Sequence, residues 1–207
     1  YVRATYRPGP LEELIRFLPE GIGVIPLFIG VRKGTEREFL DVMELYEEKI
    51  AELAGLGVDI IHPAGAPPFM LRGFQGEANI VKKLEDKHGI PIITSGMTQI
   101  EALKALGVKR FVGVTYFQGE INLKYAKYFS DAGFEVLGME GISIPFSEVG
   151  KFSSQEVYAF TKKQYLKYQN AEGIYMLGSG WRTLEIVNIL EQDLQVPVVH
   201  AVTARIW

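Results

Sequence analysis

The feature that most limits the fold of this 207-residue chain is an alternation of short apolar segments with amphipathic helices. The run from Ile22 to Ile29 is continuously apolar and rich in Ile, which is typical of a strand covered on both faces in a parallel sheet. Similar segments follow at 58–62, 90–94, 110–115, 134–139, 173–177 and 196–200. Strands that alternate with helices need crossover connections, so the sequence predicts an α/β protein with parallel sheets.

The helices between these segments carry their own start signals. Capping boxes are predicted at Thr35 with Glu38, Thr98 with Glu101 and Ser153 with Glu156. The expected helices cover 35–53, 77–88, 98–106, 120–132, 153–168 and 183–194. The prolines and the glycine of 63–68 predict a loop there, neither strand nor helix. No helix is predicted after the last strand, so we expect terminal sequence to be missing beyond Trp207.

A short motif that occurs twice in the sequence favours two similar halves. Ala54-Gly-Leu-Gly57-Val58 and Lys104-Ala-Leu-Gly107-Val108 are each followed by a strand and a polar loop. The alternative is that this pattern is only a common junction between a helix and a strand. We predict a first half formed by 1–96 plus 196–207, a second half formed by 97–195, and a cleft between them.

The composition excludes several kinds of chemistry. The chain has no cysteine, which excludes disulfides, thiolate metal sites and thiol nucleophiles. Its three histidines lack the spacing of a transition-metal site, so no metal is expected. A net charge of −3 provides no basic field for nucleic acid. No apolar run is long enough to span a membrane, so the sequence predicts a cytoplasmic protein and leaves open whether it forms a homo-oligomer.

Ligands of parallel sheets bind beyond the carboxyl ends of strands, where helix amino termini favour anions. The loops 62–68, 115–119 and 178–181 occupy such places, and Gly178 and Gly180 around Ser179 allow the backbone to approach a ligand. A small carboxylate is the expected ligand; the alternative is that these glycines only form tight turns. A dinucleotide site is less favoured, because the third glycine and the acidic residue after the next strand are missing.

Candidate catalytic residues follow from the lack of sulfur. His62 and His200 end predicted strands, where their imidazoles could exchange protons with a ligand, or could be hydrogen-bonded structural groups. Ser179 could donate to an oxyanion or cap a helix, and Tyr116 could supply a phenol or fill space. Four residues in or near these loops are candidates for substrate binding. Arg72 and Arg182 could bind a second carboxylate. Phe117 and Trp181 could contact an apolar portion of the substrate.

Four segments in order resemble a known superfamily. They are Gly65-Ala-Pro-Pro-Phe-Met-Leu-Arg72-Gly73, Ala105-Leu-Gly-Val-Lys-Arg110, Gly173-Ile-Tyr-Met-Leu-Gly-Ser-Gly180 and Val196-Pro-Val-Val199 near Trp207. Over nearly the whole chain they resemble the aspartate/glutamate racemase superfamily, above all its arylmalonate decarboxylase and maleate isomerase branch. The resemblance implies two pseudo-symmetric flavodoxin-like halves and catalysis without a cofactor. It also implies that backbone and hydroxyl donors bind a carboxylate while a cysteine moves a proton at the neighbouring carbon.

The sequence departs from that pattern at the cysteines. The two cysteine positions fall on Gly65 and Gly178, and Ala66 and Phe117 stand where the decarboxylases carry hydroxyl donors. Tyr116 is adjacent to the second of these positions and could replace it. We therefore expect a cofactor-free lyase or isomerase, similar to a decarboxylase, that acts on a small carboxylic acid through an enediolate-like intermediate. The alternative is a non-catalytic protein of the same fold that binds a carboxylate metabolite.

Overall fold

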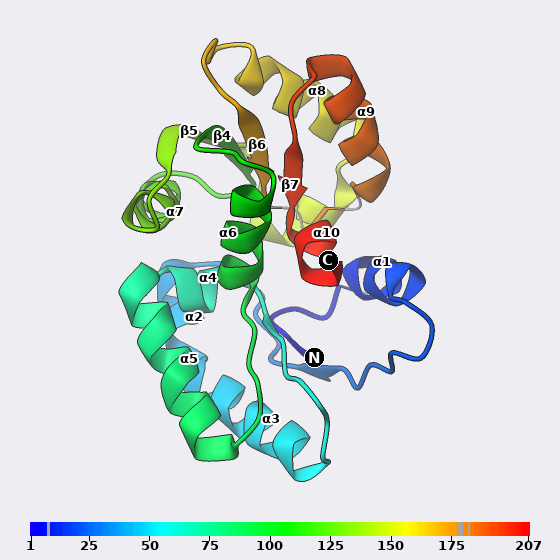
Figure 1. Ribbon diagram of the computed structural model, residues 1–207, viewed down its shortest axis with the longest axis vertical. Helices are drawn as coiled ribbons and strands as arrows, with labels where there is room; N and C mark the ends of the chain where they lie inside the picture. The colour runs from blue at the N-terminus through cyan, green and yellow to red at the C-terminus, as the bar shows by residue number, and fades with distance from the viewer. Residues whose placement is uncertain (8, 178–179, 182) are drawn as a thin grey trace.

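The computed structural model describes residues 1–7, 9–177, 180–181 and 183–207, which form two parallel sheets (Figure 1). The first sheet has the order β2-β1-β3, with β1 at Val2–Arg3, β2 at Leu27–Phe28 and β3 at Pro63–Ala64. The second has the order β5-β4-β6-β7, formed by Glu135–Gly141, Arg110–Thr115, Gly173–Met176 and Val198–His200. All strand pairs are parallel, which confirms the predicted fold class.

Helices cover both sheets and fill the space between them. The early helices are α1 (Gly9–Phe17), α2 (Glu36–Asp41), α3 (Met43–Gly55), α4 (Ala66–Met70), α5 (Phe74–His88) and α6 (Ser95–Ala105). The later ones are α7 (Glu120–Asp131), the 3-10 helix η1 (Phe146–Lys151), α8 (Ser154–Tyr165), α9 (Leu184–Leu194) and α10 (Ala201–Ile206). Figure 1 shows α2 to α5 around the first sheet, α7 to α9 around the second, and α6 with α10 between them.

The prediction of a loop at 63–68 is wrong, because this segment contains β3 and the first three residues of α4. Pro63 begins an edge strand, a place where proline is tolerated, and the preceding carbonyl of His62 accepts from the Val2 N–H at 3.0 Å. Pro67 and Pro68 lie in the first turn of α4, where backbone N–H groups have no partner within the helix. Prolines at these positions therefore allow the strand and the helix.

The start of α6 also differs from the prediction. Thr94 is its N-cap and accepts from the Met97 N–H at 3.3 Å, whereas Thr98 lies inside the helix and donates to the Ser95 carbonyl. The predicted capping box at Thr98 is therefore wrong, while the box of Ser153 with Glu156 is confirmed. The expected strand 90–94 is reduced to a single bridge between Ile61 and Ile92.

The carboxyl-terminal segment contains a helix that was not predicted. Six residues of α10 are too few to show a helical period, and His200 caps the helix. The strand before it, β7, pairs with β6 in the second sheet, although 196–207 was expected in the first half. From there α10 packs against α6 and α1. The other boundaries of the two halves stay a prediction.

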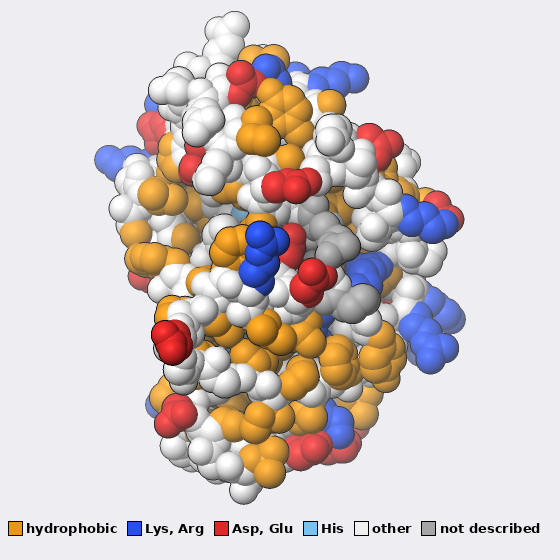
Figure 2. Space-filling model, turned by 90° about the vertical axis from the view of Figure 1, so that its right-hand side faces the viewer, with side chains coloured by type: hydrophobic (Ala, Val, Ile, Leu, Met, Phe, Trp, Pro, Cys, Tyr) orange, Lys and Arg blue, Asp and Glu red, His pale blue; other side chains and the backbone are white. Residues whose placement is uncertain are grey.

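Apolar side chains are exposed on α1 and on the segment that leads to the edge strand β2. Ile15, Phe17, Ile22 and Ile25 are each between 44% and 55% exposed. Figure 2 shows hydrophobic side chains gathered over the lower half of this face of the molecule. This apolar surface lies on helices and an edge strand at the outside of the fold.

None of the helices in the described ranges is long and apolar enough to cross a membrane.

Candidate functional site

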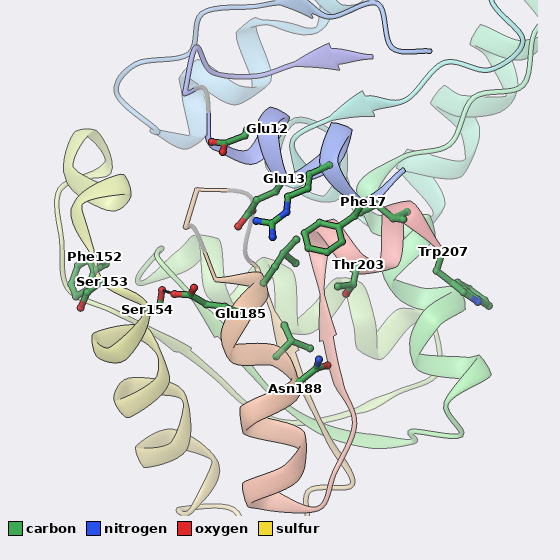
Figure 3. A pocket seen from close by; sticks show the side chains of 14 residues that line it. Glu12, Glu13, Phe17, Phe152, Ser153, Ser154, Glu185, Asn188, Thr203 and Trp207 are labelled. Carbon is green, nitrogen blue, oxygen red and sulfur yellow. Dashed lines mark hydrogen bonds between the residues drawn. The ribbon is translucent and has the colours of Figure 1, made fainter. Parts of the chain in front are cut away.

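A hollow of about 920 Å³ lies between α1, α8, α9 and α10 (Figure 3). Among the described residues, its charged lining consists of Glu12, Glu13 and Glu185 against Arg16. Figure 3 shows Glu13 on α1 and Glu185 on α9 at facing sides of the hollow. None of the predicted site residues that the structure describes lines it. The hollow is therefore not where the described part of the predicted site comes together.

A second cavity lies where the two halves meet, and it does bring predicted residues together. It measures about 30 Å³, room for about two water molecules. Gly65 and Ala66 line it from the first half, and Tyr116 and Phe117 line it from the second. The other residues that line the cavity lie mostly on or beside β1, β3 and α4. They are Tyr1, Arg3, Ala4, Thr5, Arg7, Ala64 and Pro67, together with Phe39 of α2, Phe146 of η1 and Leu177 after β6.

On the first half, backbone geometry excludes any side chain at Gly65. Its φ is +116°, a region that glycine adopts far more readily than other residues. A Cβ atom there would lie 2.8 Å from the Ala4 Cβ and 3.1 Å from the Tyr46 Oη. Tyr46 is itself held by donating to the Ala64 carbonyl at 2.7 Å. The position where the resemblance would place a cysteine therefore leaves little room for a thiol in this chain.

On the second half, buried polar groups fix the loop after β4. Thr115 Oγ1 accepts from the Phe117 N–H at 3.0 Å and donates to Asn122 Oδ1 at 2.7 Å. Asn122 Nδ2 donates to the Phe117 carbonyl at 2.8 Å. Gly141 lies against that same carbonyl, since a Cβ there would come within 1.7 Å of it. These contacts hold Tyr116 and Phe117 at the carboxyl end of the strand, facing the first half.

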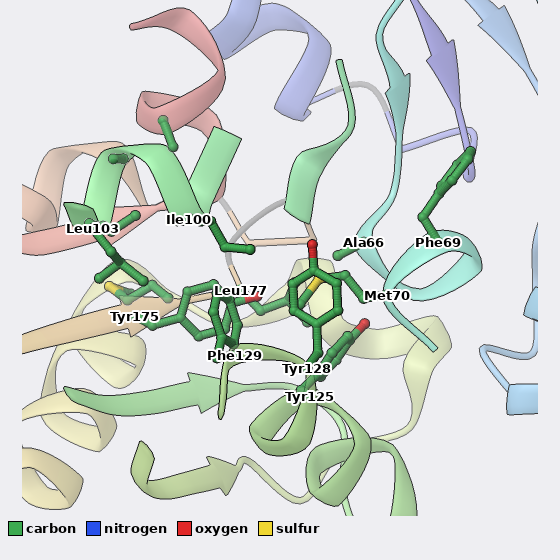
Figure 4. Close-up of a cluster of buried hydrophobic side chains, with 14 of the residues drawn as sticks. Ala66, Phe69, Met70, Ile100, Leu103, Tyr125, Tyr128, Phe129, Tyr175 and Leu177 are labelled. Carbon is green, nitrogen blue, oxygen red and sulfur yellow. The ribbon is translucent and has the colours of Figure 1, made fainter. Parts of the chain in front are cut away.

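Aromatic rings close the cavity. The Phe117 ring stacks on Phe146 of η1 with centroids 5.9 Å apart, and its edge meets Phe39 of α2 at 5.7 Å. Tyr116 meets the edge of Trp181 at 5.2 Å, and Trp181 is fully buried behind it without lining the cavity. Figure 4 shows Ala66 and Leu177 in one buried cluster with the rings of Tyr125, Tyr128 and Tyr175. Aromatic rings thus form much of the wall of the cavity.

The charged lining of this cavity is positive. Arg3 is only 4% exposed and its Nη1 donates to the Arg7 carbonyl at 2.5 Å. Arg7 is half-buried, its Nη2 donates to the Phe146 carbonyl, and its guanidinium lies 4.3 Å from the centre of the Phe146 ring. In the described part of the chain, no Asp or Glu forms an ion pair with either arginine. Burial lowers the pKa of Arg3 from its usual value.

Tyr116 lies in the field of these arginines. Burial raises the pKa of its phenol above the usual value, because the charged phenolate loses its water. Arg7, Arg3 and Arg205 act in the opposite direction, as does a backbone hydrogen bond to Gly180. Gly180 lies close to the ring, since a Cβ there would come within 3.0 Å of Tyr116. The phenol is therefore protonated at neutral pH, with positive charge nearby to stabilise its anion.

Neither candidate histidine lines the cavity. His200 is fully buried, its Nδ1 accepts from the Val202 N–H at 3.1 Å, and its Nε2 lies 2.9 Å from the Thr183 hydroxyl. Burial lowers the pKa of His200 to about 3. His62 stacks on Tyr1 at 5.7 Å, and burial, then Arg205, lower its pKa well below the usual value. Both imidazoles are neutral at pH 7, and the contacts of His200 favour the structural interpretation.

The remaining predicted residues lie elsewhere or outside the described ranges. Arg72 is exposed and donates to the Leu40 carbonyl at 3.0 Å, beside a surface hollow that it shares with Glu44 and Glu47. Gly178, Ser179 and Arg182 lie outside the described residues. Among the residues that are described, no three His, Asp or Glu side chains gather in a way that could hold a metal ion.

Sequence reasoning missed Arg3, Arg7 and Phe146. The two arginines lie on and just after a strand of two residues, which is too short to show a pattern. Phe146 lies on the 3-10 helix η1, five residues after the end of β5. The one available signal was a pair of arginines four positions apart at the start of the sequence.

A family model and a sequence relative agree on the kind of protein. The model of the arylmalonate decarboxylase family matches residues 12–207. The arylmalonate decarboxylase of Bordetella bronchiseptica is 21% identical over 180 residues, which are 86% of this chain and 75% of that protein. The match of the family model covers most of the chain, including the second sheet, β2 and β3, and the cavity residues from Phe39 onward.

Solved structures show the same fold at low identity. The maleate isomerase of Pseudomonas putida has a TM-score of 0.91 at 19% identity, covering 100% of this chain and 88% of that one. A maleate cis-trans isomerase of Nocardia farcinica, with a covalently bound succinylcysteine intermediate, has a TM-score of 0.89 at 18% identity and covers 99% and 87%. The present chain has no cysteine for such an intermediate. From the extent of the family match we conclude that the chain belongs to the arylmalonate decarboxylase family.

Proposed function

We propose that this protein is a cofactor-independent lyase or isomerase that acts on a small carboxylic acid in the cavity between its halves. The proposal rests on the cavity between the two halves. Gly65, Ala66, Tyr116 and Phe117 line it, and the charged residues in its lining are positive. Its relatives include proteins named arylmalonate decarboxylase and maleate isomerase. A substrate of the same kind, a small organic acid, fits the charge of the lining.

In the lyase form of the reaction, a carboxylate leaves as CO₂ and its bonding electrons pass to the neighbouring carbon. A second carboxyl group on that carbon delocalises the pair as an enediolate, whose oxygens need hydrogen-bond donors. We assign that role to backbone amides of the loop 178–181, following the glycine pattern of the sequence. The reaction then ends when a proton is added to the carbon.

We assign the proton to Tyr116, because no thiol is present and both histidines face other partners. Its phenol lines the cavity and is protonated at neutral pH, so it is an acid rather than a base. When it donates, the phenolate that remains is stabilised by Arg7 and Arg3, and water restores the proton. Ser179 is the second candidate from the sequence.

The test is incubation with a panel of arylmalonates and maleate in D₂O, followed by NMR. We expect release of CO₂ or isomerisation, with one deuterium at the reacting carbon. Tyr116→Phe is expected to lower kcat by about 100-fold or more, the usual effect of removing a general acid. Tyr6→Phe, at a tyrosine that is 61% exposed, is the matched control and should leave kcat unchanged. Absence of turnover and of deuterium uptake with every acid would refute the proposal.

The second candidate function is binding without chemistry. It is favoured by the missing thiols and by the small volume of the closed cavity, about 30 Å³. Such a protein would be stabilised against heat by a carboxylate that is recovered unchanged. Thermal-shift measurements on the same panel of acids, combined with NMR of the recovered ligand, separate the two functions.

A further inference from the structure

We infer that Arg3 and Arg7 bind a carboxylate group of the ligand and determine the specificity of the cavity for an anion. The inference rests on the proposed function, because it takes the cavity between the halves as the binding site. The amide donors expected in the loop 178–181 are uncharged. Guanidinium groups would add recognition of net charge, which distinguishes an acid from its neutral analogue.

Arg3 supplies the first line of support. It is 4% exposed, and the charged or titratable groups that act on it are Tyr1, Arg205, Tyr116 and Arg7. None of these four groups is a carboxylate. A buried cation without a counter-charge is costly, and protein folds tolerate it mainly where a ligand supplies the missing charge. Among the described residues, the Arg3 guanidinium has one hydrogen bond, from Nη1 to the Arg7 carbonyl at 2.5 Å.

Arg7 places a second positive charge at the same cavity. The contact between the Arg3 guanidinium and the Arg7 carbonyl holds the two residues together, and both side chains line the cavity. The Arg7 guanidinium lies over the Phe146 ring, which orients it without neutralising it. A planar carboxylate matches the parallel N–H groups of a guanidinium, whereas a neutral amide of equal size does not gain the same charge-assisted bonds.

Access for a ligand requires movement of Phe146. A second hollow of about 360 Å³ lies on the outer side of Tyr116, Phe117 and Phe146, which separate it from the cavity with the arginines. Because Phe146 lies on a short 3-10 helix and is half-buried, displacing its ring joins the two spaces. The same displacement removes the ring from the Arg7 guanidinium, which lies 4.3 Å from its centre, so opening and exposure of the arginine are linked.

Isothermal calorimetry with malonate and maleate tests the role of Arg7, with malonamide as the neutral analogue. The wild-type protein should bind the two acids and not malonamide. Arg7→Gln keeps an N–H donor for the Phe146 carbonyl but removes the charge, and should weaken binding of both acids about tenfold or more. Arg37→Gln removes an arginine whose side chain is 92% exposed and should leave binding unchanged.

Arg3→Met provides a readout that a purely structural arginine would not give. Without ligand, this variant should have a higher Tm than the wild type, because it removes a buried charge that has no counter-charge. With malonate, its Tm should no longer rise, whereas that of the wild type should. A lower Tm without ligand, together with an unchanged response to malonate, would show that Arg3 only supports the fold and would overturn the inference.

The outcomes separate this inference from the proposed function. Binding of the acids that depends on both arginines supports the inference, and if no acid of the panel is turned over, the enzyme is refuted while the inference stands. Turnover with the same KM in Arg7→Gln and wild type supports the enzyme and overturns the inference. Failure of malonate and maleate to bind the wild type also overturns it.

Discussion

His200 shows how a buried histidine makes stability depend on pH. In the folded protein its pKa is about 3, whereas an unfolded histidine has a pKa of about 6.5. Between these values the unfolded chain binds a proton that the folded chain does not. Folding is therefore weakened as the pH falls below about 6.5, and the full contribution is present above it. The lowered pKa of His62 acts in the same direction.

His200→Asn should reduce this pH dependence without removing the helix cap. An Asn side chain can accept from the Val202 N–H as Nδ1 does now, and asparagine is a favoured N-cap residue. Because one titrating group contributes at most about 1.4 kcal/mol per pH unit, the difference in unfolding free energy between pH 6 and pH 5 should shrink by up to that amount. Urea unfolding at the two pH values measures it. An equal difference in wild type and variant would contradict the assignment.

At the scale of elements, the two halves differ in how well local sequence describes them. The strand β4 has the predicted bounds, and α7, α9 and α8 lie close to theirs, because each carries a long apolar pattern or a clear cap. In the first half the strands β1, β2 and β3 have two residues each. Strands this short are defined by their neighbours in the sheet, so their exact positions could not be read from a pattern.

The helix α8 allows a direct test of a local signal. The Ser153 hydroxyl accepts from the Glu156 N–H at 3.3 Å, and the Ser153 N–H donates to the Glu156 carboxylate at 2.8 Å. Ser153→Ala removes the cap and should lower the free energy of unfolding by about 1 kcal/mol. Ser130→Ala, at an exposed position near the end of α7, should change it by less than about 0.5 kcal/mol. Chemical denaturation of both variants gives the comparison, and equal losses would argue against the cap.

At the scale of the whole molecule, contacts across the seam join the halves into one unit. The Phe74 ring of α5 meets Tyr128 of α7 at 5.8 Å, and the Tyr128 hydroxyl donates to the buried Glu77 carboxyl group. Burial raises the pKa of Glu77, which favours its neutral form at this position. Lys124 of α7 also pairs with Glu36 of α2. The seam is therefore held by apolar, polar and charged contacts at once.

These contacts predict that the two halves unfold together. Far-UV circular dichroism reports on the helices of both halves, whereas tryptophan fluorescence reports on Trp181 and Trp207, which both lie late in the chain. The two signals should follow one urea transition with the same midpoint, as in a two-state protein. A fluorescence transition that is displaced from the circular dichroism transition would mean that the halves are separate folding units.

The sequence by itself determined the α/β class, the family resemblance, the lack of thiol chemistry and most elements of the second half. These conclusions depend on local patterns: residues a few positions apart that share a face, a cap or a turn. It also indicated Gly65, Ala66, Tyr116 and Phe117, because the carboxyl ends of parallel strands lie at one edge of a sheet.

Only the tertiary structure decided what surrounds those four residues. Arg3 comes from the first strand and Arg7 from the segment after it, Phe146 comes from a 3-10 helix about 140 residues later, and they meet at one cavity with Tyr116. His200, whose position at a strand end was correctly foreseen, is engaged by Thr183 and the α10 backbone instead. The physical reason is that the charge and the hydrogen bonds of a side chain depend on its neighbours in space, which the packing of the two halves selects.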